Sequence, residues 1–170
     1  MHGIDLNFQL RTSKTNAAIP LDPSAPCIWD SEQHLWISVG GASGGTDVYC
    51  CDVDDFDLEF WSSEFSINAR ANQHKETINA CLSNGRYWNF RRSMGQPAII
   101  SFAYGILAGL LAELTEGVVV SDDSAWDYAR FPATSHEVYE WYFNPAMALD
   151  RKYGDWAKEC LALIASDGRK

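Results

Sequence analysis

The chain has 170 residues, of which 46% are hydrophobic and 13% aromatic, and its formal net charge is −10. This content suits one compact domain of residues 1–170 and excludes a disordered acidic tail, which would carry few aromatic residues. The acidic balance also disfavours nucleic acid as a direct ligand, because phosphate binding needs Lys and Arg.

Two further features narrow the class of protein. The five cysteines show no CxxC or paired Cys/His spacing, which indicates neither a disulfide framework nor a zinc site. The amino terminus lacks a basic segment followed by an unbroken apolar run, so we expect no secretory signal and a cytoplasmic location.

The first third of the chain has the pattern of strands. Apolar and polar residues alternate over residues 4–10 and again over 35–39, which predicts strands with one buried face. The glycine-rich residues 40–45 predict a turn, and strand-like stretches follow at residues 48–53 and 58–61. We therefore expect an antiparallel meander.

The period becomes helical after Ser63. The apolar residues of segment 67–82, Ile67 among them, share one helical face, and Asn84 with Gly85 predicts the helix end. Residues 86–92 then predict another strand.

Residues 97–112 form the most apolar run of the chain. The run has 16 residues without a charge, and crossing a bilayer takes about 20. Its small residues, Gly105 and Gly109 among them, would let a core helix lie close to a sheet. We expect a central helix and no membrane association.

The last part of the chain predicts one short strand at residues 118–121 and then helices. Thr134 and Glu137 have the spacing of a capping box, which predicts a helix over 135–143, and a final helix would be weakened or broken at Gly154. Strands first and helices later predict an α+β fold. Its antiparallel sheet would come largely from the N-terminal half and pack against the central apolar helix and the C-terminal helices.

The negative charge is concentrated in one segment. Nine of the 23 acidic residues lie in residues 30–64, which contain no Lys or Arg, and the other 14 are nearly balanced by 13 Lys and Arg. Crowded carboxylates repel one another unless a basic partner lies opposite, and complementary charge speeds association. We therefore expect a basic protein to bind here, with the candidate contact residues Asp52, Asp54, Asp55, Asp57, Glu59 and Trp61.

The aromatic residues Phe56, Phe60 and Trp61, interleaved with these acids, would supply contact anchors. A solvated acidic strand edge, which protects a sheet from aggregation, would have the same composition. The two interpretations stay open on this segment alone.

A second group of acids follows the predicted strand at residues 118–121. Asp122, Asp123 and Asp127 with His136 would suit a metal-dependent hydrolase, although no compact ligand motif such as HExxH supports it. No GxSxG, P-loop, dinucleotide-binding or EF-hand pattern is present either. The sequence therefore predicts no enzyme, no cofactor and no metal, with the hydrolase as the alternative.

Residues 87–128, YWNFRRSMGQPAIISFAYGILAGLLAELTEGVVVSDDSAWDY, resemble immunity proteins of bacterial polymorphic toxin systems, in particular the immunity protein 52 family. The resemblance rests on Trp88 before the Gly95-Gln96 turn, the small-residue apolar helix, and the S-D-D-x-A-W-D stretch of residues 121–127. It covers about the middle quarter of the chain well.

The resemblance implies a cytoplasmic, non-enzymatic protein that neutralises a cognate toxin, often one delivered by contact-dependent or type VI secretion. The implied toxin has a restriction-endonuclease-like nuclease domain, whose basic surface an acidic inhibitor would cover. Asp122, Asp123 and Trp126 would then face the partner or, equally, form a structural corner. An acidic adaptor for some other basic protein is the third hypothesis.

Overall fold

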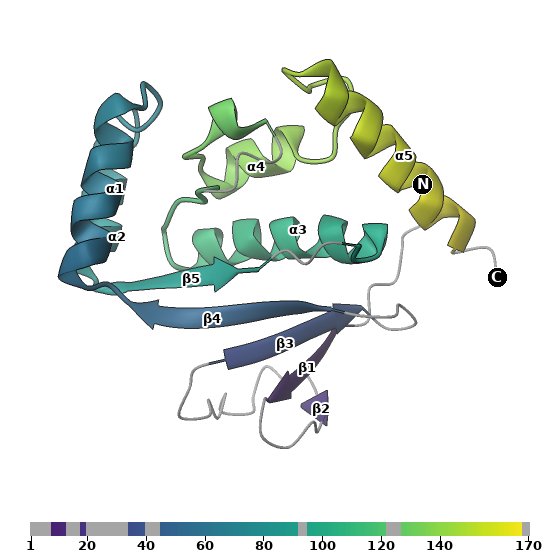
Figure 1. Ribbon diagram of the computed structural model, residues 1–170, viewed down its shortest axis with the longest axis horizontal. Helices are drawn as coiled ribbons and strands as arrows, with labels where there is room; N and C mark the ends of the chain where they lie inside the picture. Colours follow the sequence, from purple (N-terminus) through teal and green to yellow (C-terminus); the bar gives the residue numbers. More distant parts are fainter. Residues whose placement is uncertain are drawn as a thin grey trace. The chain divides into compact units, whose positions relative to one another are not determined.

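The computed structural model describes residues 8–12, 18–19, 34–39, 45–91, 95–121 and 127–167. Strands dominate the early part of the chain and helices the rest, so the predicted α+β class is confirmed (Figure 1). The elements in chain order are β1 (Phe8–Thr12), β2 (Ala18–Ile19), β3 (His34–Val39), β4 (Thr46–Asp52), α1 (Asp55–Ile67), α2 (Lys75–Ser83), β5 (Arg86–Phe90), α3 (Ala98–Leu114), the short 3₁₀ helix η1 (Tyr128–Arg130), α4 (Ser135–Trp141) and α5 (Arg151–Asp167).

The five strands form one sheet in the order β2-β1-β3-β4-β5 (Figure 1). β1 pairs antiparallel with both β2 and β3, so Leu10 has Ile19 on one side and Ile37 on the other. β3 and β4 form the next antiparallel pair, with Leu35 opposite Val48. The strands predicted at residues 4–10, 35–39 and 48–53 correspond to β1, β3 and β4, which pair antiparallel in chain order as the predicted meander requires. The short edge strand β2 is an addition that the pattern did not predict.

The chain divides into two compact units, each made of separate segments. The sheet unit comprises Met1–Cys51, Trp88–Tyr104 and Ala162–Lys170, and the helical unit comprises Asp52–Tyr87 and Gly105–Leu161. The boundary falls inside α3 and inside α5, so each of these helices contributes to both units.

One predicted strand is wrong. Residues 58–61 lie inside α1, because the helix already begins at Asp55. The predicted helical face of residues 67–82 is also interrupted, since α1 ends at Ile67 and turns lead to α2. Asn84 and Gly85 end α2 as predicted, and Gly85 has a φ of 73°, which glycine adopts without strain.

The glycines of α3 allow close packing, although the neighbour in the helical unit is the α4 region and not a sheet. A Cβ at Gly105 would lie 2.1 Å from Cζ of Tyr142, and one at Gly109 would lie 2.9 Å from Cε1 of Tyr139. The buried ring of Tyr142 therefore occupies space that only a glycine leaves open, whereas the partly exposed ring of Tyr139 is only a close neighbour of Gly109.

Aromatic side chains form much of the core of the helical unit. Ring centroids lie 5.2 Å apart for Phe131 and Trp141, 5.0 Å for Tyr142 and Phe143, and 5.1 Å for Phe143 and Trp156. Edge and tilted contacts of this kind stabilise a core beyond the area that they bury. They join η1, α4 and α5 around one centre.

The C-terminal elements follow the predictions in part. The capping box of Thr134 and Glu137 is present and begins α4. The predicted strand at residues 118–121 is reduced to one bridge, between Val119 and Ala133. Residue Gly154 does not break α5, and a Cβ there would lie 3.1 Å from the carbonyl oxygen of Pro145.

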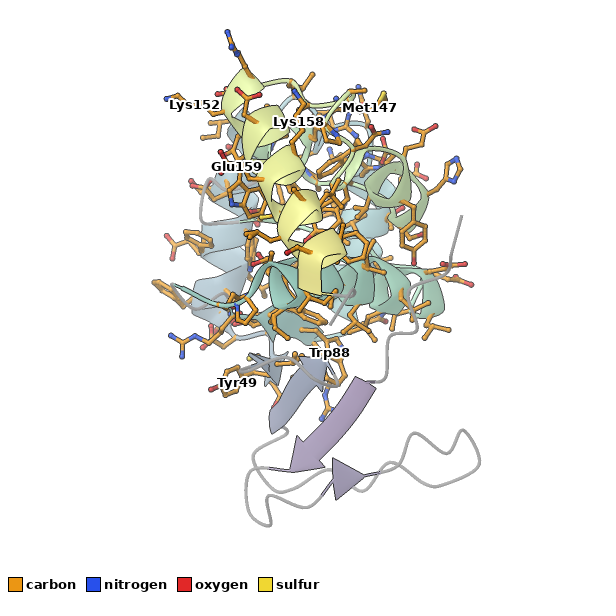
Figure 2. The ribbon with its side chains drawn as sticks, turned by 90° about the vertical axis from the view of Figure 1, so that its right-hand side faces the viewer. Tyr49, Trp88, Met147, Lys152, Lys158 and Glu159 are labelled. Carbon is orange, nitrogen blue, oxygen red and sulfur yellow. The ribbon has the colours of Figure 1, made fainter. Side chains whose placement is uncertain are left out.

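The exposed side of α5 carries charged residues. Lys152, Lys158 and Glu159 point into solvent (Figure 2), whereas Ala157 and Cys160 are buried. This division is the ordinary amphipathic pattern of a helix packed on one side.

Candidate functional site: an acidic helix with an exposed apolar face

Two acidic residues begin α1. Asp54 is the N-cap, and its Oδ1 accepts a hydrogen bond of 2.8 Å from the backbone N–H of Asp57. Asp57 reciprocates, since its Oδ2 accepts a bond of 3.2 Å from the N–H of Asp54. This capping box satisfies two otherwise unpaired donors and places negative charge at the positive end of the helix dipole. Two of the acidic residues that we predicted to contact a partner, Asp54 and Asp57, therefore stabilise the helix itself.

The amino end of α1 is fastened to the turn between α2 and β5. The N–H of Val53 donates to the carbonyl oxygen of Gly85 over 2.8 Å. The hydroxyl of Tyr87 donates to Asp57 over 3.4 Å. These contacts hold the start of α1 in place.

The carboxyl end of α1 is fastened by one asparagine. Asn68 caps the helix, and its Nδ2 donates to the carbonyl oxygen of Phe131 over 3.0 Å. Its Oδ1 accepts from the backbone N–H of Arg70 over 2.9 Å. With both ends held, the intervening turns are positioned although α1 contains no buried residue.

The inner side of α1 carries the half-buried aromatic residues. Trp61 and Phe65 stack with ring centroids 5.5 Å apart and an interplanar angle of 22°. Trp61, which we predicted as a partner contact, thus lies on the half-buried side of the helix.

The outer side of α1 carries apolar residues that the protein does not cover. The exposed fraction is 74% for Phe56, 42% for Phe60 and 81% for Ile67. Their spacing of four and then seven residues places them along one face, which we call the apolar stripe. Ile67 was predicted to share one helical face with the apolar residues up to Leu82, and that prediction is wrong because Ile67 ends α1 and the others follow it.

Three acids of α1 are unpaired. Asp55, Glu59 and Glu64 have neither a hydrogen bond nor an ion pair to another side chain among the residues that the structure describes. No Lys or Arg occurs between residues 52 and 64. We call these three residues the unpaired acids; Asp55 and Glu59 are exposed to solvent and Glu64 is half-buried.

The other predicted contact residues fall into two groups. Asp52, at the end of β4, accepts from Nε of Arg86 over 3.1 Å, and both side chains are exposed. An exposed ion pair of this kind contributes only about 0–1 kcal/mol to stability. Asp52 can therefore exchange Arg86 for a Lys or Arg of a partner protein. Asp122, Asp123 and Trp126 lie outside the described residues.

Asp127 is buried and bonded to backbone. Its two carboxylate oxygens accept from the N–H groups of Leu149 and Asp150 over 3.0 and 3.1 Å. Nε of Arg130 lies 3.5 Å from Oδ2, an ion pair without hydrogen-bond geometry, and the guanidinium also donates to the carbonyl oxygen of Met147. The side chain thus joins η1 to the segment before α5.

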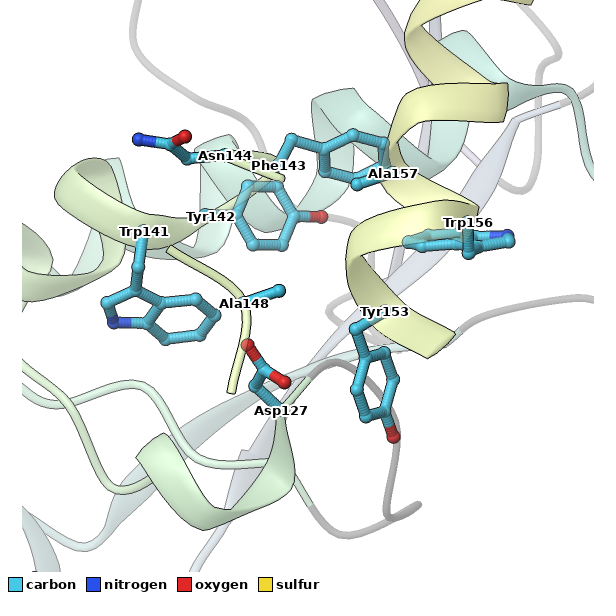
Figure 3. A pocket seen from close by; sticks show the side chains of 9 residues that line it. All are labelled: Asp127, Trp141, Tyr142, Phe143, Asn144, Ala148, Tyr153, Trp156 and Ala157. Carbon is cyan, nitrogen blue, oxygen red and sulfur yellow. The ribbon is translucent and has the colours of Figure 1, made fainter. Parts of the chain in front are cut away.

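Asp127 and five aromatic residues are among the residues that line a shallow recess open to solvent (Figure 3). A carboxylate among aromatic rings suggests a site for an organic cation. Here the protein supplies that cation itself, since the guanidinium carbon of Arg130 lies 5.4 Å from the centre of the Trp141 ring. We therefore regard the recess as structural.

Glu137 is the centre of a second structural cluster. Besides capping α4, its carboxylate lies 2.5 Å from the guanidinium of Arg70 and 3.3 Å from Nε2 of His74. Partial burial by itself raises the pKa of Glu137, but the backbone N–H of Thr134 and the guanidinium of Arg70 together lower it below its ordinary value. The cluster ties the turn after α1 to the start of α4.

These contacts bear on the alternative of a metal-dependent hydrolase. Asp127 already accepts two backbone hydrogen bonds, and His136 is exposed on the first turn of α4. The described residues contain no group of three or more His, Cys, Asp or Glu arranged to hold a metal ion. Among them there is also no helix with the length and apolarity to span a bilayer.

One feature of the site escaped the sequence analysis. Phe56, Phe60 and Trp61 were expected together as anchors, with Phe60 and Trp61 on a strand of residues 58–61. The spacing Asp54-x-x-Asp57 would have revealed the helix start. In a helix, Trp61 lies on the half-buried side of α1 and the apolar stripe lies on the exposed side.

No family model, characterised protein or solved structure matched this chain.

Proposed function

We propose that this protein binds a basic protein through α1 and inhibits it without catalysis, as an immunity protein does for its toxin. The observation that carries the proposal is the set of unpaired acids on a helix whose ends are fixed. The resemblance of residues 87–128 to immunity proteins supplies the biological class of partner.

The cost of this arrangement supports a binding role. Neighbouring carboxylates without cations destabilise a folded protein by mutual repulsion. Asp54 and Asp57 offset their repulsion by capping the helix, but Asp55, Glu59 and Glu64 have no such compensation within the described residues. A partner that presents Lys and Arg would remove the repulsion on binding.

A nuclease fits this partner chemistry. A nucleic-acid-binding surface must be rich in Lys and Arg, because it neutralises phosphates. An acidic helix placed on that surface competes with the substrate and needs no reaction of its own. The cognate toxin would thus be a secreted protein with a nuclease domain.

A protection assay tests the proposal. We expect a large secreted protein with a C-terminal nuclease domain to be encoded beside this chain, and expression of the nuclease domain to stop growth unless this protein is co-expressed. The test variant carries Asp55→Asn, Glu59→Gln and Glu64→Gln, none of which removes a capping contact.

The matched control loses the same charge elsewhere, through Glu76→Gln, Glu140→Gln and Glu159→Gln, all exposed and outside α1. We expect the α1 variant to protect poorly and the control variant to protect well. Absence of binding between the two wild-type proteins, or equal protection by both variants, would contradict the proposal.

A further inference from the structure

The apolar stripe has the spacing of a coiled-coil seam. Phe56, Phe60, Ser63 and Ile67 follow one another by four, three and four residues, as the a and d positions of a heptad do. The seam runs about 16 Å along the helix, at about 1.5 Å per residue. Its three large apolar members are exposed, which is unusual for an apolar seam in a protein that stands alone.

Acids border this seam on both sides. With Phe60 at an a position, Asp57 and Glu64 fall at e positions and Glu59 falls at a g position. These are the positions that form ion pairs across a helix pair and select the partner. In α1 all three are acidic and the flanks contain no cation.

We infer that α1 is recognised by a helix of the basic partner, one that presents apolar residues to the stripe and Lys or Arg to its acidic flanks. This inference rests on the proposed function and adds the shape and chemistry of the contact. The stripe would bury against the partner helix, while the flanking charges would choose that helix and fix its register.

A second copy of this chain fits the apolar stripe less well than a basic helix does. Two α1 helices facing each other would bring together flanks in which three of the four e and g positions are acidic, the fourth being Ser66, and each chain carries a net charge of −10. Like charges at e and g positions oppose pairing. The acidic flanks that disfavour pairing with a second copy of α1 therefore favour pairing with a basic helix.

A designed peptide tests the inference without the toxin. The probe is a helical peptide of about three heptads with Leu at its a and d positions and Lys at its e and g positions. One control peptide has Glu in place of Lys, and a second has the probe's composition in a scrambled order without the seam. Binding is followed by NMR titration of the labelled full-length protein.

We expect the probe to shift the amide resonances of α1 and the two control peptides to bind at least about tenfold more weakly. Replacing Phe56, Phe60 and Ile67 by Ser should weaken probe binding by at least about tenfold. The matched control, Leu110→Ser with Leu114→Ser, removes exposed apolar residues of α3 and should bind the probe as the wild type does.

The outcomes separate the two proposals. Equal binding of the probe and the scrambled peptide, or an unchanged affinity of the stripe variant, would overturn the helix-pairing inference and leave the charge-based proposal in place. Sedimentation that shows a dimer, converted to a monomer by the stripe substitutions, would assign the stripe to a second copy instead. A toxin domain that does not bind the wild-type protein would overturn the proposed function itself.

Discussion

Replacing Gly105 with Ala is expected to destabilise the protein, although Ala is the better helix former. The added Cβ would lie 2.1 Å from both Cζ and Oη of Tyr142 and 2.6 Å from Cε2. These separations are far below the 3.4–4 Å of ordinary contact. Because Tyr142 is itself buried, its ring cannot swing into solvent to make room.

Two opposing effects determine whether Gly105→Ala raises or lowers the free energy of unfolding. Ala gains about 1 kcal/mol over Gly in a helix interior. Forcing an extra carbon into a packed core costs about 1–3 kcal/mol, and so short an approach belongs at the upper end. We expect a net loss of about 2 kcal/mol, which lowers the melting temperature of a chain this long by about 4–8 °C.

Gly109→Ala is the matched control, one turn along the same helix. Its Cβ would lie 2.9 Å from Cε1 of Tyr139, whose ring is partly exposed and makes an exposed hydrogen bond to Glu113, so that it can shift. This variant should range from neutral to about 1 kcal/mol more stable. Urea and thermal unfolding, followed by tryptophan fluorescence, measure both variants. A Gly105→Ala protein as stable as the wild type would refute the packing argument.

Three further substitutions test the remaining contacts. Glu137→Gln should cost about 1–2 kcal/mol at neutral pH. Folding lowers the pKa of Glu137 below its ordinary 4.5, so the stabilisation is fully present above pH 4.5 and is lost as the pH falls through the pKa of the folded protein. The acid unfolding curves of the variant and the wild type should therefore converge at low pH. Asp54→Ala should remove about 1 kcal/mol and raise hydrogen exchange in α1 about fivefold, whereas Asp55→Asn should leave exchange unchanged. Asp127→Ala should cost about 3 kcal/mol, because it removes two partly buried hydrogen bonds to backbone N–H groups and places Ala at a φ of 52°. Asp127→Asn, which tolerates that φ, should cost less by urea unfolding.

Local signals in the sequence predicted several elements correctly. The capping box at Thr134 placed the start of α4, and Asn84 with Gly85 placed the end of α2. The apolar run of residues 97–112 became most of α3. Each of these predictions rests on side chains that act within one or two turns of the backbone, so no distant contact was needed.

The wrong predictions have two physical causes. Over residues 58–61 the apolar and acidic side chains alternate as on a strand, and only the reciprocal bonds between Asp54 and Asp57 settle the helix. At Gly154 a weak helix former stands in an intact helix, where the carbonyl oxygen of Pro145 would leave only a tight fit for a Cβ. A local cap decided the first case, and its spacing is present in the sequence. In the second case Gly154 lies against the carbonyl of Pro145, a contact that the helical pattern of the sequence does not reveal.

The distribution of charge in the sequence predicted the candidate site, and the contacts in the structure changed the roles of some of its residues. The nine acids of residues 30–64 located the surface. The structure divided those at the start of α1 between two roles, since Asp54 and Asp57 cap the helix whereas Asp55 and Glu59 face solvent. An experiment that replaces Asp54 and Asp57 would therefore mix loss of folding with loss of binding.

The most direct measurement is the rate at which this protein associates with the nuclease domain of the proposed toxin, followed by stopped-flow fluorescence across a range of salt concentrations. If α1 attracts the partner by charge, association should slow steeply with salt, because exposed charges are screened beyond about 10 Å at 0.1 M salt. The variant with Asp55→Asn, Glu59→Gln and Glu64→Gln should associate at least about tenfold more slowly at low salt, with a weaker salt dependence than the variant of Glu76, Glu140 and Glu159. Equal rates and equal salt dependence for the two variants would contradict the central claim that α1 is the binding surface.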